Sequence, residues 1–455
     1  MEQTYPRFTP DMKKTHKILI PNMAPVQFRI LAASMENHGY QVELLGNCGE
    51  RVAELGLKYV HNDTCYPALL VIGQFLDALD SGKYDLDHTA LIITQTGGGC
   101  RASNYIFLLR KALEKAGYGN IPVLSLNFSG LEKDSSMPMD LKFMRQALAA
   151  IYYGDLLMTL RAQTQPYELE AGAAERLQNK WLDILCDEVR HDKGYSGREM
   201  KAVMPKIAAE FAAIPVRRVP KVKVGVVGEI YVKYSPLGNN ELEKFLASQD
   251  CEVNLPGLMG FVQYCAYNMA ETVRLYGGSL VEKTAAEAAL ALIAGMEKVI
   301  IKTLKDAGYH APMPFSELIK LPEQSHTIGM GCKMGEGWLL TAEMLELVRS
   351  GYENIVCAQP FGCLPNHICG KGMINKIRTI YPRANITPID YDPGATRVNQ
   401  ENRIKLMLSV AKERLGQSGG TPPQGGAAEK VPVYGGMEVP AVHVPGFAEK
   451  LPANG

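Results

Sequence analysis

The chain has 455 residues, 46% of them hydrophobic, and its 48 Lys and Arg residues are balanced by 48 Asp and Glu residues. This length predicts two or three domains, and the charge balance gives no reason to expect a nucleic-acid partner or an anionic membrane surface. No apolar run approaches the roughly 20 residues that span a bilayer, and the N-terminal residues lack the apolar core of a signal peptide, so we expect a cytoplasmic protein in which structural disulfides are disfavoured.

Strand and helix patterns alternate through the first part of the chain. Helix patterns around Phe28 and Leu31, and later at 71–79 and 106–119, separate short buried-strand patterns. The strand patterns lie at residues 17–22, 41–45, 89–96 and 121–127. This β-α-β order predicts a parallel sheet with helices on its faces. We therefore expect a first α/β domain over residues 15–137.

The rest of the chain repeats this plan after a helical excursion. Residues 138–215 carry helix patterns and end at the proline-rich, basic junction I-P-V-R-R-V-P-K. We expect a second α/β domain over residues 216–415, with a helical insertion at about 260–310. Its strand patterns begin at Val222 and continue at 251–256, 354–360 and 385–392. Residues 416–455 are rich in Gly and Pro, which predicts a flexible tail.

Cys100 follows one of these strand patterns, in the segment T-Q-T-G-G-G-C-R-A-S-N-Y. Gly97, Gly98 and Gly99 allow a tight turn and the close approach of a ligand. A helix expected to start near Ser103 aims its N-terminal N–H groups at this turn, which predicts a lowered thiol pKa and an anionic ligand or cluster. Ligands of open parallel sheets lie beyond such strand ends. The alternative is a phosphate-binding loop in which the cysteine is incidental, although the segment lacks G-x-G-x-x-G.

Cys65 and Cys363 lie in two loops that resemble each other, C-Y-P and C-L-P. A proline two residues after the thiol fixes the backbone and makes the loop rigid. The two loops belong to two different predicted sheets, so the same C-x-P arrangement occurs once with each sheet. Like Cys100, both thiols have polar residues, glycine or proline around them, so we expect ligands or nucleophiles instead of packing residues.

The remaining cysteines differ in their surroundings. Cys332 lies in a glycine-rich loop, Cys48 ends a strand pattern, and Cys357 lies within a strand pattern from which it could face the core. Structural zinc is disfavoured because the chain has no C-x-x-C pair. Three cysteines in more apolar contexts are expected to be buried packing residues. They are Cys186, Cys251 and Cys265.

Dispersed thiols without tight pairs favour an iron–sulfur cluster held between domains, because soft thiolates select such clusters. Three thiolate ligands leave one iron position open to a substrate. Arg101 and Lys371 could offset the negative charge of such a site, or they could be ordinary surface charges. Glu229 ends a predicted strand, where its carboxylate could be an acid, a base or a ligand, or could cap the following helix.

The segments N-D-T-C-Y-P-A, T-G-G-G-C-R-A-S-N-Y, G-E-I-Y-V, Q-P-F-G-C-L-P-N-H-I-C-G-K-G and I-D-Y-D-P-G-A-T resemble the 2-hydroxyacyl-CoA dehydratase superfamily. The most similar branch is the dehydratase-like part of the large CoA-substrate-specific activase proteins, related to the double-cubane cluster proteins. The resemblance covers roughly residues 15–415. It implies two flavodoxin-like domains with a cluster in the cleft between them, held as 4Fe–4S by Cys65, Cys100 and Cys363.

A double-cubane 8Fe–9S cluster is the other form that the resemblance allows. Such relatives use about six cysteines. The additional thiols available here are Cys48, Cys332, Cys357 and Cys369. The sequence leaves open whether one cubane or two are present.

The resemblance also implies a partner. The chain shows no G-x-x-x-x-G-K-[ST] phosphate loop, so the ATPase is expected to be a separate activator of actin or sugar-kinase type. The expected function is an iron–sulfur reductase component that takes low-potential electrons from this activator and reduces a small substrate. The alternatives are a 2-hydroxyacyl-CoA dehydratase subunit and a non-catalytic electron relay or scaffold. A homodimer or a hetero-oligomer is expected.

Overall fold

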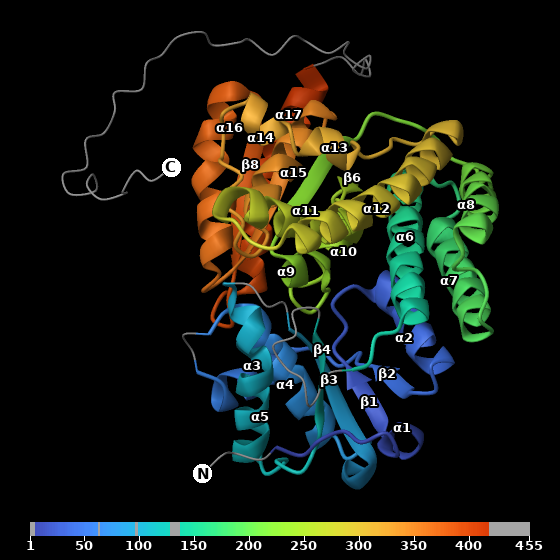
Figure 1. The fold of residues 1–455 in the computed structure, drawn as a ribbon. Coiled ribbons are helices and arrows are strands. Elements are labelled where there is room, and N and C mark those ends of the chain that lie inside the picture. Colours follow the sequence, from blue (N-terminus) through green and yellow to red (C-terminus); the bar gives the residue numbers. More distant parts are fainter. Residues whose placement is uncertain (1–4, 62–63, 96–98, 128–136, 418–455) are drawn as a thin grey trace, which may run out of the picture.

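The computed structural model describes residues 5–61, 64–95, 99–127 and 137–417, which form two four-stranded parallel sheets (Figure 1). The first sheet has the order β2-β1-β3-β4 and the second has the order β6-β5-β7-β8. The strands of the first are β1 Lys17–Ile20, β2 Gln41–Leu44, β3 Thr89–Gln95 and β4 Val123–Asn127. Those of the second are β5 Val222–Gly228, β6 Cys251–Asn254, β7 Asn354–Pro360 and β8 Asn385–Tyr391. The predicted α/β class with two parallel sheets is confirmed.

The two sheets have the same connectivity, and the register is parallel throughout. In the first sheet Lys17 pairs with Gln41 of β2 and with Thr89 of β3. In the second, Val227 of β5 pairs with Cys357 of β7. Because all strands of a sheet run the same way, their carboxyl ends meet at one edge, and the loops that leave this edge carry the candidate residues.

The first domain places its helices on both faces of its sheet. They are α1 Met12–Thr15, α2 Pro25–Asn37, α3 Glu50–Tyr59, α4 Tyr66–Asp80, α5 Tyr105–Ala116 and the 3₁₀ turns η1 Leu86–His88 and η2 Arg101–Asn104. Helix α4 is almost entirely buried. A helix buried on all sides is a rigid support for the residue at its N-terminus, which is Cys65.

A helical layer lies between the two sheets along the chain. It contains α6 Leu141–Thr164, η3 Gln165–Tyr167, α7 Ala173–Arg190 and α8 Gly197–Ala212. The second domain follows with α9 Ile230–Tyr234, α10 Leu242–Ser248, α11 Leu258–Tyr276, α12 Leu280–Asp306, α13 Phe315–Leu318, α14 Leu321–Gln324, α15 Trp338–Arg349, η4 Asn366–Gly370, η5 Lys371–Met373, α16 Ile374–Ile380 and α17 Arg397–Gln417. Among the described helices, none combines the length and apolarity that a bilayer crossing needs.

Asp155 on α6 ties three elements together. Its carboxylate accepts hydrogen bonds from Gln27 of α2 at 2.8 Å and from the backbone N–H groups of Leu258 and Met259 at 3.0 and 2.8 Å. Burial raises the pKa of Asp155 to about 6, although these three donors oppose the shift. The carboxylate thus caps the N-terminus of α11 and fixes the helical layer to both domains.

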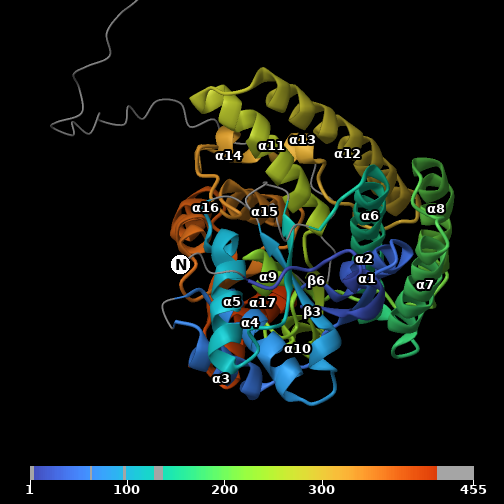
Figure 2. The same ribbon diagram turned by 60° about the horizontal axis from the view of Figure 1, so that its bottom comes forward.

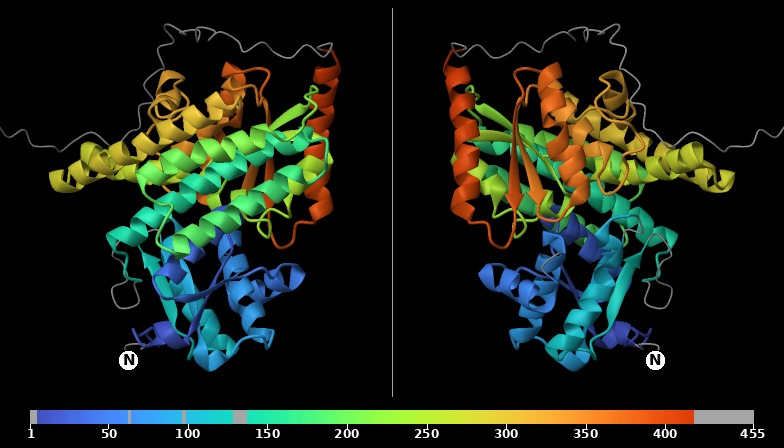
Figure 3. Two further views of the ribbon diagram at one scale, coloured as in Figure 1. Left: turned by 90° about the vertical axis from the view of Figure 1, so that its right-hand side faces the viewer. Right: turned by 90° about the vertical axis from the view of Figure 1, so that its left-hand side faces the viewer.

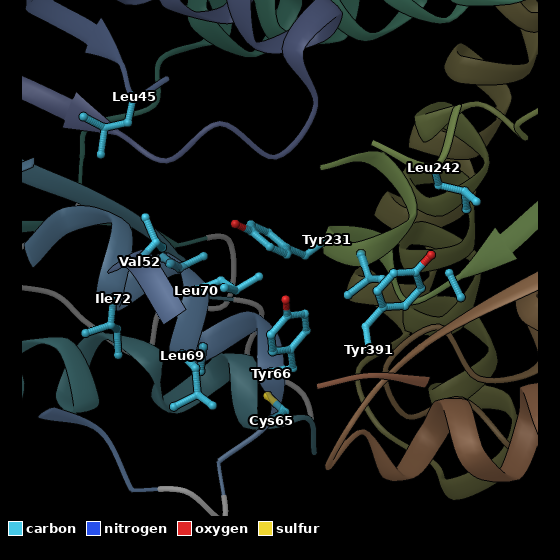
Figure 4. Close-up of a cluster of buried hydrophobic side chains, with 14 of the residues drawn as sticks. Leu45, Val52, Cys65, Tyr66, Leu69, Leu70, Ile72, Tyr231, Leu242 and Tyr391 are labelled. Atoms are coloured by element: carbon cyan, nitrogen blue, oxygen red, sulfur yellow. The ribbon is translucent and has the colours of Figure 1, made fainter. Parts of the chain in front are cut away.

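One apolar cluster is continuous across the two domains. Leu69 and Tyr66 of α4 belong to the same cluster as Tyr231 of α9 and Tyr391 of β8. Figure 4 shows Cys65 and Tyr66 on the first-domain side, with Tyr231 reaching from the second domain toward the residues of α4. The carboxyl edges of the two sheets therefore meet at a packed junction.

Candidate thiol and carboxylate site

Cys65 is the N-cap residue of α4, and Pro67 follows within the first turn. The side chain is buried, with 6% of its surface exposed, and its Sγ lies 2.8 Å from the hydroxyl oxygen of Tyr105. Burial raises the pKa of the Cys65 thiol. The contact with Tyr105 lowers it, Glu229 raises it and Arg101 lowers it slightly. The predicted rigid loop thus presents a shielded thiol to the domain junction.

Cys100 follows β3 and precedes η2, which leads into α5. The predicted lowering of its thiol pKa is wrong: burial raises that pKa to about 11, and the carboxylates of Glu336 and Glu229 add to the rise. The backbone N–H of Ala102 opposes the shift without overcoming it. The sequence did not place these two carboxylates, which come from the second domain, beside the Cys100 thiol. Gly97 and Gly98 of the predicted turn lie outside the described residues.

Cys363 follows β7 in the second sheet and is 8% exposed. Its loop contacts the Cys65 loop directly, because the carbonyl of Phe361 accepts a hydrogen bond from the backbone N–H of Tyr66 at 3.1 Å. Gly362 has a φ of +75°, and a Cβ there would lie 3.2 Å from the Cα of Cys65. Glycine is therefore required both by the backbone conformation and by the close approach.

The structure brings the three thiols to one junction between the two sheets. Burial is the largest cause of the raised pKa of Cys363. Glu336, Glu229 and Cys100 raise this pKa further, so these groups lie within electrostatic reach of the Cys363 thiol. Cys65 also raises the pKa of Cys100. A second contact closes the junction, since a Cβ on Gly99 would lie 2.6 Å from Met334 Sδ.

Two carboxylates lie beside the thiols, and both accept hydrogen bonds from the N-terminus of the short helix α9. Glu229 caps α9 and accepts from the backbone N–H of Val232 at 2.9 Å, while Glu336 accepts from the N–H of Ile230 at 3.0 Å. Burial raises the pKa of both side chains, and repulsion from Glu336 raises that of Glu229 further. Two such groups at one helix N-terminus cannot both ionise readily, so at neutral pH the pair retains a proton.

Glu336 is a site residue that the sequence did not predict. The available signal was its position in G-M-G-C-K-M-G-E-G-W, the glycine-rich loop in which Cys332 was the predicted residue. The capping alternative for Glu229 holds, because its side chain does cap α9. The same position faces the thiols, so capping and a chemical role are compatible.

A buried ion pair supports the carboxylates from behind. Lys233 Nζ on α9 lies 2.8 and 3.0 Å from the two carboxylate oxygens of Glu343 on α15, and both side chains are 5% exposed. Lys233 also lowers the pKa of Glu336, against the effect of burial. Glu346, one turn along α15, is buried too, and its pKa is raised to about 7.

Three of the other predicted residues lie in different surroundings. Cys357 is fully buried in β7, with its Sγ 3.2 Å from where a Cβ on Gly370 would lie, so it packs inside the second domain. Cys48 is exposed on the loop between β2 and α3. Lys371 is about half-exposed and lies 3.7 Å from Asp390. Of the predicted catalytic residues, Glu229 and Arg101 act on the thiols electrostatically.

Two further thiols lie near Glu336. Burial raises the pKa of Cys369 to about 11, and Cys332 and Glu336 add to the rise. Cys332 is exposed and Cys369 is buried. Cys186 and Cys251 are buried as predicted, but the prediction that Cys265 is buried is wrong, because it lies on an exposed face of α11. The apolar residues around Cys265 belong to helix α11, and one face of this helix is exposed to solvent.

Comparison with known proteins adds no assignment: neither a family model nor a curated protein matches the chain. Among the described residues, no three His, Cys, Asp or Glu side chains are placed to hold a single metal ion. A cubane binds each thiolate through a different iron, so its ligands stand farther apart than those of one ion. Cys65 and Cys363 are buried at the close approach of Gly362, and the partly buried Cys100 lies within electrostatic reach of both, so the three thiols are a donor set that fits such a cluster.

Proposed function

We propose that this chain is an iron–sulfur reductase component that receives low-potential electrons from a separate ATP-hydrolysing activator and reduces a small substrate. The observation that carries the proposal is the convergence of Cys65, Cys100 and Cys363 from two sheets beside the buried pair Glu229 and Glu336. A thiol triad supplies soft ligands, and the adjacent acids supply a proton.

The three thiols would hold the cluster, which supplies a store of low-potential electrons and an open iron position. Each thiol must lose its proton on binding iron, and the metal charge drives this loss against the raised pKa. Arg101 lowers the pKa of Cys65 and so favours the thiolate. If a second cubane is present, Cys332 and Cys369 are the additional thiols that lie near Glu336.

Glu229 and Glu336 would supply protons during substrate reduction. A neutral substrate that gains electrons must also gain protons, so a reductase needs an acid close to the reacting atom. The pair retains a proton because burial and mutual repulsion raise its pKa. Lys233 lowers the pKa of Glu336 and would thereby keep this pKa low enough for the proton to be released.

Exposed apolar side chains surround Cys363 and would receive the activator. Phe361, Leu364 and Ile368 are 52, 68 and 52% exposed, and Met334 from the facing loop is 55% exposed. An apolar rim of this kind marks a contact surface for another protein and would shield the site from water when covered. ATP would bind to that partner and not to this chain.

The test is anaerobic purification followed by iron and acid-labile sulfide analysis. We expect brown protein, and the iron count separates 4Fe–4S from 8Fe–9S. Cys100→Ala should lose cluster iron while retaining its fold. Cys186→Ala is the matched control, because this thiol is buried among helices α6 to α8, and it should retain the iron. Colourless protein containing zinc, or full iron in both variants, would refute the ligand assignment.

Turnover then separates the three functional alternatives. With activator and ATP, reduction of acetylene, azide or hydrazine supports the reductase. Dehydration of a 2-hydroxyacyl-CoA instead identifies a dehydratase subunit. A reduced cluster that passes electrons only to another protein identifies a relay. All three assays use the same cluster-loaded wild-type protein, so their results can be compared directly.

A further inference from the structure

A cavity of about 500 Å³ lies where α2 and the helical layer meet the second domain. Its walls come from the start of α2, from α6 and α7, and from α10 and β6. Figures 2 and 3 show α2, α6 and α7 side by side in this part of the molecule. The volume is in the range of small-molecule sites, roughly 300–1,000 Å³. None of Cys65, Cys100 and Cys363 lines this cavity, which is therefore distinct from the thiol site.

The N-terminus of α2 forms part of the wall, through Pro25 and Val26. In the described part of the chain no side chain caps this end of the helix. Because an α-helix leaves its first N–H groups unsatisfied, those of Val26 and Gln27 have no partner within their own helix. The helix dipole adds roughly half a positive charge at the same end, so the start of α2 favours an anion.

Helix α6 carries Arg161 past this end of α2. Ser34 donates to Gln146 at 2.7 Å and Gln27 donates to Asp155 at 2.8 Å, so the two helices run antiparallel. Arg161 follows Asp155 by six residues, which is about 9 Å along α6, whereas α2 begins only two residues before Gln27. The Arg161 side chain, which lines the cavity, therefore starts from beyond the end of α2 toward which the free N–H groups point.

Two side chains of the wall have buried donors that are unsatisfied. Arg161 forms an ion pair through Nη2 with Glu243, but its Nε has no hydrogen-bond partner among the described residues. Gln178 of α7 is 5% exposed, and its Nε2 has none among them either. Gln178 lies close to the start of α2, because the neighbouring Asn179 accepts from Arg29 at 3.3 Å. Buried donors are nearly always hydrogen-bonded, so these two call for an acceptor from outside the chain.

We propose that this cavity binds a small monocarboxylate with an apolar chain. Its carboxylate would accept hydrogen bonds from the start of α2, from Arg161 and from Gln178, and such charge-assisted bonds are strong. Its chain would lie against the aliphatic side chains of the walls, where burial stabilises it. These side chains include Met158, Leu182, Leu242 and Leu255.

The charges of the walls favour one negative charge on the ligand over two. The lining residues include four Arg and Lys and four Asp and Glu side chains. All four of these cations form ion pairs, with Asp183, Glu243, Glu343 and Glu241. The uncompensated positive charge is then that of the helix end, roughly half an elementary charge. A dianion would face the four acids with too little positive charge to balance it, whereas one carboxylate is matched.

Isothermal titration calorimetry of the full chain with a series of carboxylates tests the ligand class. From butyrate through pentanoate to hexanoate, the dissociation constant should fall about fourfold for each added CH₂ group. Hexanamide has the size of hexanoate without its charge, and adipate has the same number of carbons with two charges. Each should bind at least about tenfold more weakly than hexanoate.

Variants test the site. Gln178→Met and Arg161→Met should each raise the dissociation constant of hexanoate about tenfold. Gln178→Met should keep the fold, because the lost Nε2 bonds no described residue, and circular dichroism checks this. Arg176→Met is the matched control, since Arg176 is paired with Glu170 and lies outside the cavity, so binding should not change.

Four results would each overturn the proposal. They are no binding of hexanoate at millimolar concentration, equal binding of hexanamide, an unchanged dissociation constant in the folded Gln178→Met variant, and an equal loss of binding in Arg176→Met. None of these measurements requires a cluster or an activator, so their outcome is separate from that of the iron analysis.

Discussion

The two sheets have the same strand order, but their carboxyl edges contribute different chemistry to the junction. The first sheet brings Cys65 and Cys100, held by α4 and by the turn before α5. The second brings Cys363 together with Glu229, Glu336 and the ion pair behind them. The same strand order thus presents two thiols at the edge of the first sheet and one thiol with two carboxylates at the edge of the second, so the loops and not the sheets account for the difference.

The largest expected effect on stability comes from Lys233, which forms the ion pair behind the carboxylates of the second sheet. Lys233→Met leaves Glu343 buried without its partner, which we expect to lower the free energy of unfolding by about 3–5 kcal/mol. Urea denaturation of the metal-free protein measures this. Adding Glu343→Leu should recover most of the loss, because the unpaired charge is removed as well. If the double variant is no more stable than the single one, the ion pair does not act as a unit.

The contact between the Cys65 loop and the Cys363 loop depends on Gly362. Gly362→Val should cost about 2–3 kcal/mol, since it combines a left-handed backbone with a clash against Cys65. Gly82→Val is the control, because Gly82 has a φ of +70° with no atom within 4 Å of an added Cβ. It should cost less and leave cluster loading unchanged. Equal losses of stability in both variants would show that the approach to Cys65 is loose.

The carboxylate pair should make stability depend on pH. The folded-state pKa of each acid is raised above its unfolded value, so its stabilisation is complete at low pH and is lost as pH rises through the shifted range. Between about pH 5 and about pH 8 we expect Glu336→Gln to reduce this loss by about 1–2 kcal/mol, because Glu229 no longer faces a second acid. Asp155 and Glu346 contribute equally in both proteins. Identical pH profiles would contradict the pairing.

The smallest expected effect concerns the Cys65 thiol and the Tyr105 hydroxyl beside it. Tyr105→Phe removes the hydroxyl beside Cys65, which should raise the thiol pKa further and cost about 1 kcal/mol. Alkylation of Cys65 at fixed pH, followed by mass spectrometry, should slow. Tyr118→Phe removes an exposed hydroxyl that donates to Asp80 and should not change that rate. Faster alkylation in Tyr105→Phe would mean that the ring shields the thiol more than the hydroxyl activates it.

Much of the fold could be predicted from the sequence, because buried parallel strands are nearly continuous apolar runs bounded by Gly and Pro. The segments containing β3 and β7 are examples. The site was less accessible. Cys65, Cys100 and Cys363 stand out by their local surroundings, but the pKa of Cys100 is raised by burial at the junction and further by Glu336 and Glu229, which are more than a hundred residues away. Cys265 shows the same limit, since its local sequence is apolar although its side chain lies on an exposed face of α11.

The hydrogen bond from Tyr66 to Phe361 and the close approach at Gly362 fasten the two halves backbone to backbone. Hinged separation of the halves would therefore pull Cys363 away from Cys65 as it began. We therefore expect access to the buried thiols to depend on the exposed loops that carry Met334 and Leu364. This backbone contact favours local movement of the loops over a hinge motion of the whole protein.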